Sequence, residues 1–281
     1  MAGGELLGRA GANLRRLGYF KGRDFDESAF RAAVKEFKGV YAKAYGWAVD
    51  EDVEETLPVL VSPQCGNADR VGRGPLAGSS NEFPIKVFLK QPPTADLGPQ
   101  GGDPFAEVRS AIDTWNEEGS KYSLTLFEEV RGEAAARCVV AWKSEDLDFG
   151  DDVIARADYP DSGETPLLVI FDDRKVWVVG KGAGVDIEAV ALHELGHILG
   201  LNHDEVDSDA VMNFVLDDGR RSLSFSDQLA LRDLLDAQGI EPHGLLRRVA
   251  FVALDGLVRV RGIAQASGAF VWRTVAARLA P

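Results

Sequence analysis

HELGHILGLNH, residues 193–203, holds three of the four histidines in this chain of 281 residues. In an α-helix, residues four apart lie on one face, so His193 and His197 can reach one metal ion together. Gly200 stands where the helix is expected to end in a conformation that a Cβ would resist, and the turn brings back His203 as a third ligand. Three neutral imidazoles leave a fourth tetrahedral position for water, which predicts a catalytic zinc site.

Glu194 directly follows the first of these histidines. A zinc-bound water loses its proton far more readily than bulk water does, and a carboxylate at this position can accept that proton as a general base. The carboxylic acid formed in that step can then protonate a leaving amine. The sequence therefore predicts hydrolysis of amide bonds, with Glu194 as the catalytic residue.

The zinc segment resembles the metzincin metallopeptidases, whose HExxHxxGxxH helix is followed by a methionine turn beneath the metal. Met212, nine residues after His203, fits that turn. The similarity extends to the matrixins, or matrix metalloproteinases, because LSFSDQ at 223–228 is similar to their LSxDD. By this resemblance Asp227 anchors the methionine turn. Ser226 replaces the family's first aspartate, which implies that the ion pair with a freed N-terminus is absent.

SPQCGNAD, residues 62–69, is similar to the matrixin cysteine switch, PRCGxPD. The resemblance implies that the Cys65 thiolate occupies the fourth zinc position and keeps the enzyme latent, and thiolates bind zinc well. Gln64 and Ala68 replace the family's arginine and second proline, so latency is expected to be leakier or secured in another way. Two alternatives stay open, an ordinary buried cysteine and a disulfide with Cys138.

The N-terminal part, residues 1–60, carries apolar residues at helical spacing between 6 and 19 and between 30 and 45, and the acidic run at 50–57 predicts a third helix. This layout is similar to the matrixin prodomain and to peptidoglycan-binding-like domains, so a role in cell-wall binding stays open. Residues 61–81 are expected to form the switch and a glycine-rich linker. An activating protease is expected to cut there.

Residues 82–240 are expected to form the catalytic domain. Strands are predicted at 83–89, 124–130, 138–142 and 167–171, and a helix at 104–118. By resemblance the fold class is α+β, a zincin or metzincin domain with a twisted mixed sheet of about five strands and three helices, preceded by a small three-helix prodomain. Residues 241–281 lie outside the resemblance and have no assigned function, although an Asp-Gly turn predicts a β-hairpin at 249–261.

One zinc per chain is expected. Matrixins usually carry a second zinc beside a calcium ion, but Arg156 and Ile170 stand where two of its histidines would fall, and neither can bind zinc. The acids of the calcium site would map to Asp172 and Lys175, which indicates an internal ion pair in place of the cation. Calcium elsewhere stays open among acidic residues, namely Asp146, Asp148, Asp151, Asp152, Asp161 and Asp173.

Substrate preference is expected from the same resemblance. Ala189, four residues before the first zinc histidine, would close the floor of the S1′ pocket, and Phe214, Val215 and Leu216 replace the family's Pro-x-Tyr wall. A small floor residue and an apolar wall predict a deep pocket that prefers Leu, Met or an aromatic residue at P1′.

The net charge of −14 argues against nucleic acid and anionic membranes as partners, and no apolar run approaches the ~20 residues needed to span a bilayer. Residues 1–16 lack the apolar core of a signal peptide, so secretion is expected from the resemblance alone. The predicted protein is a latent, monomeric zinc metalloendopeptidase that meets a protein or peptide substrate and an activating protease. A zinc hydrolase with a non-protein substrate, a wall-associated peptidoglycan-binding protein and an inactive zinc-binding pseudoenzyme stay open.

Overall fold

The computed structural model describes residues 2–21, 25–69, 82–94, 97, 101–145, 147, 149–180, 182–216 and 219–242. The hairpin predicted at 249–261 lies outside these residues, and so does most of the linker in which cleavage is expected.

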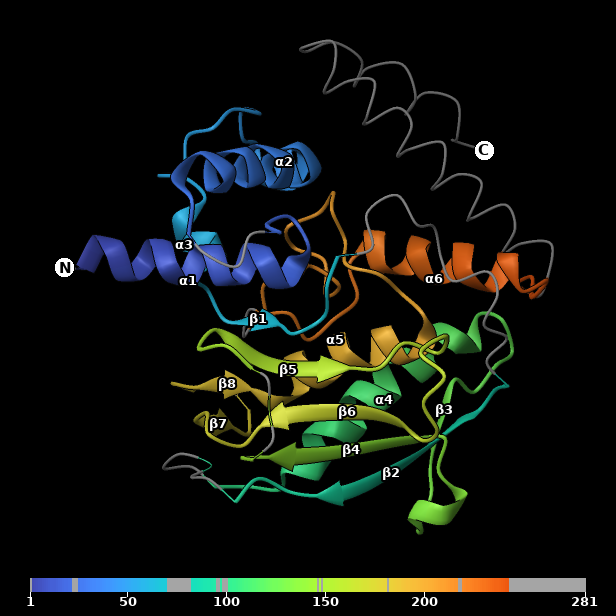
Figure 1. Cartoon of the computed structure of the whole chain (residues 1–281). Coiled ribbons are helices and arrows are strands. Elements are labelled where there is room, and N and C mark those ends of the chain that lie inside the picture. The colour runs from blue at the N-terminus through green and yellow to red at the C-terminus, as the bar shows by residue number, and fades with distance from the viewer. Residues whose placement is uncertain are drawn as a thin grey trace, which may run out of the picture.

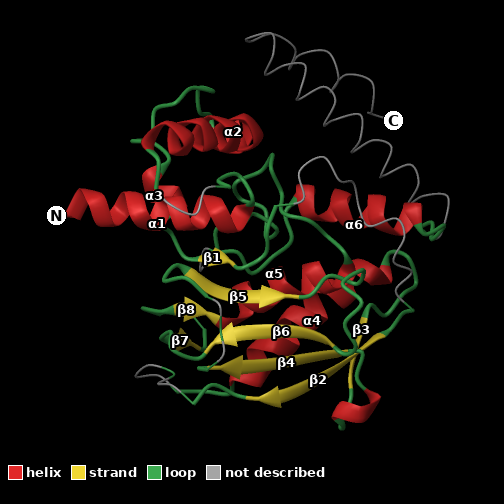
Figure 2. Cartoon of the chain, in the orientation of Figure 1, coloured by secondary structure: helices red, strands yellow, loops and turns green. Residues whose placement is uncertain are grey.

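A mixed sheet forms the centre of the fold, with the strand order β1-β5-β6-β4-β2-β3 (Figures 1 and 2). Its strands are β1 (Gln64–Cys65), β2 (Ile85–Gln91), β3 (Phe127–Glu129), β4 (Cys138–Lys143), β5 (Val153–Ala157) and β6 (Leu167–Asp172). All neighbouring strands are parallel except β5 and β6. The four strands located from the sequence correspond to β2, β3, β4 and β6, and β5 was not located; β1 comes from the segment around Cys65. The expected α+β fold is thereby confirmed.

Two helices, α4 (Pro104–Ser120) and α5 (Ile187–Leu199), lie together on one face of this sheet (Figure 1). Trp115 of α4 is fully buried, and its Nε1 donates to the Leu192 carbonyl of α5 at 2.9 Å. A third helix, α6 (Phe225–Ala237), follows the methionine segment, and a short parallel ribbon of β7 (Trp177–Val178) and β8 (Val185–Asp186) precedes α5. The zinc helix therefore packs against both the sheet and α4.

The N-terminal helices α1 (Ala2–Leu17), α2 (Glu27–Tyr45) and α3 (Leu57–Leu60) enclose a second apolar core. The helical spacing predicted for α2 is confirmed, because its buried face carries Phe30, Val34, Phe37 and Tyr41. One fully buried member of this core comes from the other end of the chain: Phe214, whose ring centroid lies 4.8 Å from that of Tyr41. The two cores therefore meet at the segment that follows the methionine turn.

The helix expected at 50–57 is wrong in its position, because α3 begins only at Leu57. The Lys38 side chain is fully buried, and its Nζ lies 2.5 Å from Asp50 Oδ1 and 2.5 Å from Glu55 Oε1. The same Nζ donates to the Asp52 carbonyl at 3.0 Å. A buried ammonium group needs such partners, so the acidic run wraps around Lys38 instead of opening a helix.

Candidate metal centre

Helix α5 carries the first two predicted ligands. Its N-cap, Asp186, accepts a hydrogen bond from Ala189 N at 3.1 Å, and its C-cap, Gly200, has φ +110°. The predicted left-handed exit at Gly200 is confirmed, because an L side chain rarely adopts that backbone conformation. The Nε2 atoms of His193 and His197 lie 3.0 Å apart, which aims both at one point.

The three imidazoles are fixed in one tautomer by their surroundings. Each Nδ1 lies close to an oxygen atom. The Nδ1 of His193 is 2.7 Å from the Val211 carbonyl oxygen, and the Nδ1 of His197 is 2.8 Å from the Leu201 carbonyl oxygen. The Nδ1 of His203 is 2.7 Å from Asp69 Oδ1. Carbonyl and carboxylate oxygens only accept, so each Nδ1 donates and each Nε2 keeps its lone pair for a metal. Burial also lowers the pKa of His193 well below its usual value, which keeps that ring neutral.

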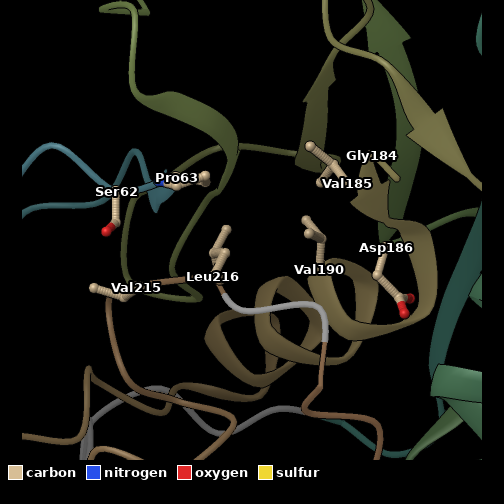
Figure 3. A pocket seen from close by; sticks show the side chains of 8 residues that line it. All are labelled: Ser62, Pro63, Gly184, Val185, Asp186, Val190, Val215 and Leu216. Carbon is tan, nitrogen blue, oxygen red and sulfur yellow. The ribbon is translucent and has the colours of Figure 1, made fainter. Parts of the chain in front are cut away.

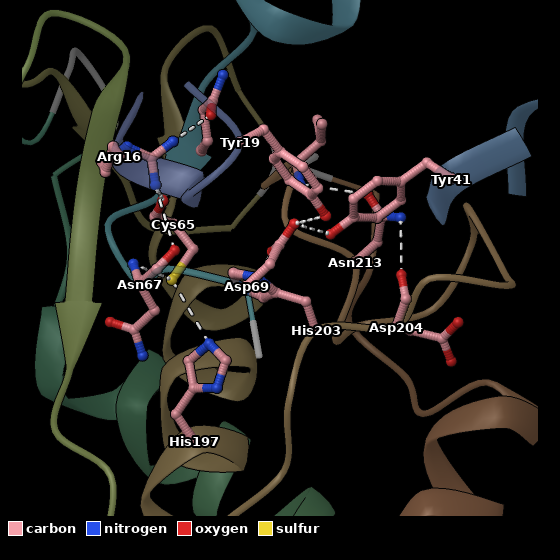
Figure 4. Close-up of polar contacts among 12 residues, drawn as sticks. Arg16, Tyr19, Tyr41, Cys65, Asn67, Asp69, His197, His203, Asp204 and Asn213 are labelled. Carbon is pink, nitrogen blue, oxygen red and sulfur yellow. Dashed lines mark hydrogen bonds and ion pairs between the residues drawn. The ribbon is translucent and has the colours of Figure 1, made fainter. Parts of the chain in front are cut away.

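Cys65 completes the cluster with the three histidines. One ligand atom of each lies within 4.8 Å of the others, and Cys65 Sγ is 3.5 Å from His197 Nε2 (Figure 4). Both cysteines of the chain are free thiols, so the alternative of a disulfide with Cys138 does not hold. Burial raises the pKa of the Cys65 thiol well above its usual value, and the neighbouring Glu194 carboxylate raises it further. A thiolate here therefore needs a cation beside it.

Two buried polar groups show that a metal fits this cluster. His203 Nε2 and both carboxylate oxygens of Glu194 have no hydrogen-bond partner among the described residues. Buried polar atoms are nearly always satisfied, so an orphaned imidazole nitrogen that faces a thiol and two further imidazoles is typical of a metal ligand. Three nitrogens and one sulfur are a donor set that zinc prefers. In the described part of the chain, no other His, Cys, Asp or Glu group of this kind is found.

Met212 lies directly beneath the zinc helix. A Cβ placed on Gly196 would stand 2.3 Å from Met212 Sδ and 3.2 Å from Trp115 Cζ2, so only glycine allows this approach. Asp227 accepts from Val211 N at 2.9 Å and from Met212 N at 3.0 Å, which ties the turn to the start of α6. The sequence singled out Met212 and Asp227 but gave no reason for Gly196.

Residues 62–69, the switch segment, run between β5 and residues 214–216, where Gln64 and Cys65 form the extended strand β1. On one side Gln64 N donates to Asp152 O at 2.8 Å and Gly66 N donates to Ala155 O at 2.6 Å. On the other side, Cys65 N donates to Phe214 O at 3.0 Å and Leu216 N donates to Pro63 O at 2.9 Å. Residues 63–66 thus lie between β5 and residues 214–216 and are bound through their backbone on both edges.

Arg16 of α1 was missed by the sequence reasoning and stands in for the arginine that the switch motif lacks. Its guanidinium donates to Gln64 Oε1 and to the Cys65 carbonyl, and more weakly to Asn67 O at 3.4 Å (Figure 4). The segment around Cys65 is therefore held by the helical domain and not by an arginine of its own loop. No local pattern could have shown this, because the contact joins residues 48 to 51 positions apart.

A pocket of about 310 Å³ opens beside the start of the zinc helix (Figure 3). Its lining consists of Ser62, Pro63, Gly184, Val185, Asp186, Val190, Val215 and Leu216. Of the four residues expected to form the S1′ pocket, Val215 and Leu216 line this pocket, whereas Ala189 and Phe214 are not part of its lining. Successive helical residues point about 100° apart, so α5 presents Val190 to this pocket, and Phe214 packs into the helical domain.

The positions of the family's other metal sites are filled by ion pairs and apolar contacts. Arg156 and Ile170 are direct cross-strand partners on β5 and β6. Fully buried Asp172 accepts from Arg174 at 2.7 and 2.8 Å and lies 3.8 Å from Lys175 Nζ. The expected internal ion pair is thus present, with Arg174 as its closer member.

The remaining candidate calcium ligands are partly engaged elsewhere. Asp173 accepts from Thr94 N at 2.9 Å, and Asp152 pairs with Arg9 and accepts from Asn13 Nδ2 at 2.8 Å. Asp146 and Asp148 lie outside the described residues.

Comparisons with known proteins agree with this geometry. A family model described as Matrixin matches residues 101–235. The hatching enzyme of Paracentrotus lividus is 29% identical over 211 residues, which cover 70% of this chain and 33% of that protein. Karilysin of Tannerella forsythia is 30% identical over 135 residues, 45% of this chain and 27% of karilysin.

A third relative is matched over more of its length. Metalloendoproteinase 5-MMP of Arabidopsis thaliana is 26% identical over 264 residues, 82% of this chain and 70% of that protein. The chain therefore spans a third or less of the first two relatives. None of the helices described here is long and apolar enough to cross a lipid bilayer.

Proposed function

Because the chain is a matrixin-like metalloproteinase, we propose that it is a latent zinc-dependent endopeptidase that hydrolyses peptide bonds. One observation carries this proposal. The groove beside the metal cluster holds residues 63–66 by backbone hydrogen bonds from both of its edges. Such a groove recognises an extended polypeptide by its main chain. This favours a protein or peptide substrate over a non-protein one.

We assign the metal to His193, His197 and His203, which would hold one zinc ion. A bound zinc supplies Lewis acidity toward the scissile carbonyl and toward water. Glu194 accepts a proton from the attacking water and returns it to the leaving amine. Burial raises the pKa of this carboxyl to about 8, which favours its role as a group that can both accept and return a proton. An inactive zinc-binding protein would have no use for a buried carboxylate beside the metal ligands.

Latency is assigned to the switch segment. Cys65 supplies the fourth zinc ligand, its strand fills the substrate groove, and Pro63 lines the pocket beside the zinc helix. Cutting the linker within residues 66–82 by another protease would release all three contacts. The proposal extends to one zinc per chain and to a monomeric and secreted enzyme. It also includes an S1′ preference for Leu, Met or an aromatic residue that packs against Val190, Val215 and Leu216.

The test combines metal analysis with cleavage of a broad peptide library before and after limited proteolysis. The expected result is one zinc per chain and cleavage that begins only after processing. A zinc-loaded, processed protein that cuts no peptide in the library would reject the proposal and leave the pseudoenzyme and the non-protein hydrolase in its place.

A further inference from the structure

Asp69, four residues after Cys65, joins the switch segment to the third histidine. Its Oδ1 lies 2.7 Å from His203 Nδ1, and the two side chains are each only 1% exposed (Figure 4). Its Oδ2 accepts from the hydroxyl of Tyr19 at 2.7 Å and from that of Tyr41 at 3.0 Å. One carboxylate oxygen is therefore used by the metal cluster and the other by the helical domain.

The three histidines differ in what their Nδ1 atoms face. His193 and His197 donate to main-chain carbonyls of the catalytic domain, whereas His203 donates to a carboxylate. A carboxylate acceptor fixes the tautomer and orientation of a ligating imidazole and makes its other nitrogen a stronger donor to the metal. The third ligand is thus the only one of the three whose support comes from the switch segment.

We propose that Asp69 is a positioning residue for zinc, supplied by the segment that inhibits the enzyme. It holds His203 in the metal-binding tautomer, so the precursor retains zinc more tightly than a chain in which this contact is broken. The inference rests on the proposed function, since it requires a zinc ion at the three histidines. The switch segment then has two separate effects on the metal: Cys65 binds it, and Asp69 supports a residue that binds it.

The experiment compares zinc release from the full-length protein with that from Asp69→Asn, measured as transfer to an excess of a chromogenic chelator. The neutral amide of asparagine either turns its NH₂ group, which cannot accept a hydrogen bond, toward His203 Nδ1, or turns its oxygen there and offers a weaker acceptor than a carboxylate. Loss of such a supporting contact commonly weakens metal binding about 10- to 100-fold. Zinc release from Asp69→Asn is therefore expected to be faster by a factor in that range.

Tyr19→Phe is the matched control, because it removes a hydrogen bond to the same carboxylate and leaves His203 untouched. Its zinc release is expected to stay close to that of wild type. If Tyr19→Phe releases zinc as fast as Asp69→Asn, or if Asp69→Asn behaves as wild type, the inference is overturned. Should Asp69→Asn fail to fold, Asp69→Ser, whose shorter hydroxyl does not reach His203, takes its place in the same comparison.

Replacing zinc by cobalt separates ligation by Cys65 from the support that Asp69 gives to His203. Cobalt bound to the Cys65 thiolate gives a charge-transfer band in the absorption spectrum, so this band reports ligation by Cys65 alone. The band is expected to persist in Asp69→Asn. Its loss would show that Asp69 acts by seating Cys65, which overturns a role through His203. A wild-type protein that binds no zinc at all would instead reject the proposed function.

Discussion

Gly196 and Met212 are in contact so close that no side chain fits between them: a Cβ on Gly196 would stand 2.3 Å from Met212 Sδ. Helix α5, which carries His193 and His197, therefore rests directly on the segment around Met212. This contact explains why a residue with poor helix propensity occupies the middle of the metal-binding helix.

Gly196→Ala is expected to destabilise the protein, because the added methyl group must displace Met212 or Trp115 in a packed core. Overpacking of this kind usually lowers the free energy of unfolding by about 1–3 kcal/mol. Denaturant unfolding of the full-length protein measures the effect. Gly132→Ala is the control, since a Cβ there meets nothing within 4 Å. Equal stability of the two variants would contradict the contact.

Glu194→Gln is expected to bind zinc and fold as wild type does but to lose most peptidase activity. The amide cannot accept a proton from water, and removal of a general base commonly lowers the rate by about 10² to 10⁴. Turnover of a fluorogenic peptide by the processed, zinc-loaded variant gives the measurement. Near wild-type turnover would remove Glu194 from the mechanism.

Cys65→Ser is expected to show peptidase activity without processing, because a neutral hydroxyl is a far poorer zinc ligand than a thiolate. The measurement is activity of the uncut chain, with its length verified by mass spectrometry. Cys138→Ala serves as the control: it removes the other free thiol, which lies in the catalytic core and outside the metal cluster. A silent, uncut Cys65→Ser protein would refute the assignment of the switch.

Arg16→Met is expected to make latency leaky. It keeps the length of the side chain but removes the donors that hold the Cys65 carbonyl and Gln64 Oε1. The uncut variant should therefore show activity between those of wild type and Cys65→Ser. Arg15→Gln changes the exposed neighbour of Arg16 and should stay as latent as wild type. If both variants are equally latent, the helical domain holds the switch by other contacts.

The folded protein is expected to contain one zinc ion per chain. Arg156 and Ile170 face each other across β5 and β6, where a second zinc would need histidines. Elemental analysis after exhaustive dialysis checks this count. Two tightly held zinc ions would falsify it and would require ligands outside the described residues.

The sequence predicted those parts of the site that depend on local spacing. His193, His197 and Gly200 follow from the geometry of one helix and its end, and Met212 and Asp227 follow from motifs of a few residues. Arg16 and the bond from His203 to Asp69 were not predicted, because they join segments 48 or more positions apart. Phe214 was misplaced for the same reason: whether an apolar residue lines a pocket or fills a neighbouring core depends on what packs against it.

The position of β1 has a consequence for the processed enzyme that we propose. In the full-length chain β5 is an interior strand, with β6 on one side and β1 on the other. Removal of the switch segment turns β5 into an edge strand with unpaired main-chain donors and acceptors, a surface to which other chains readily add. A bound substrate would then take the place of β1 beside β5 until it is cleaved and released. Since pairing of a substrate with β5 uses only main-chain hydrogen bonds, it does not depend on the substrate's side chains. Any sequence preference must then come from the pockets beside the strand.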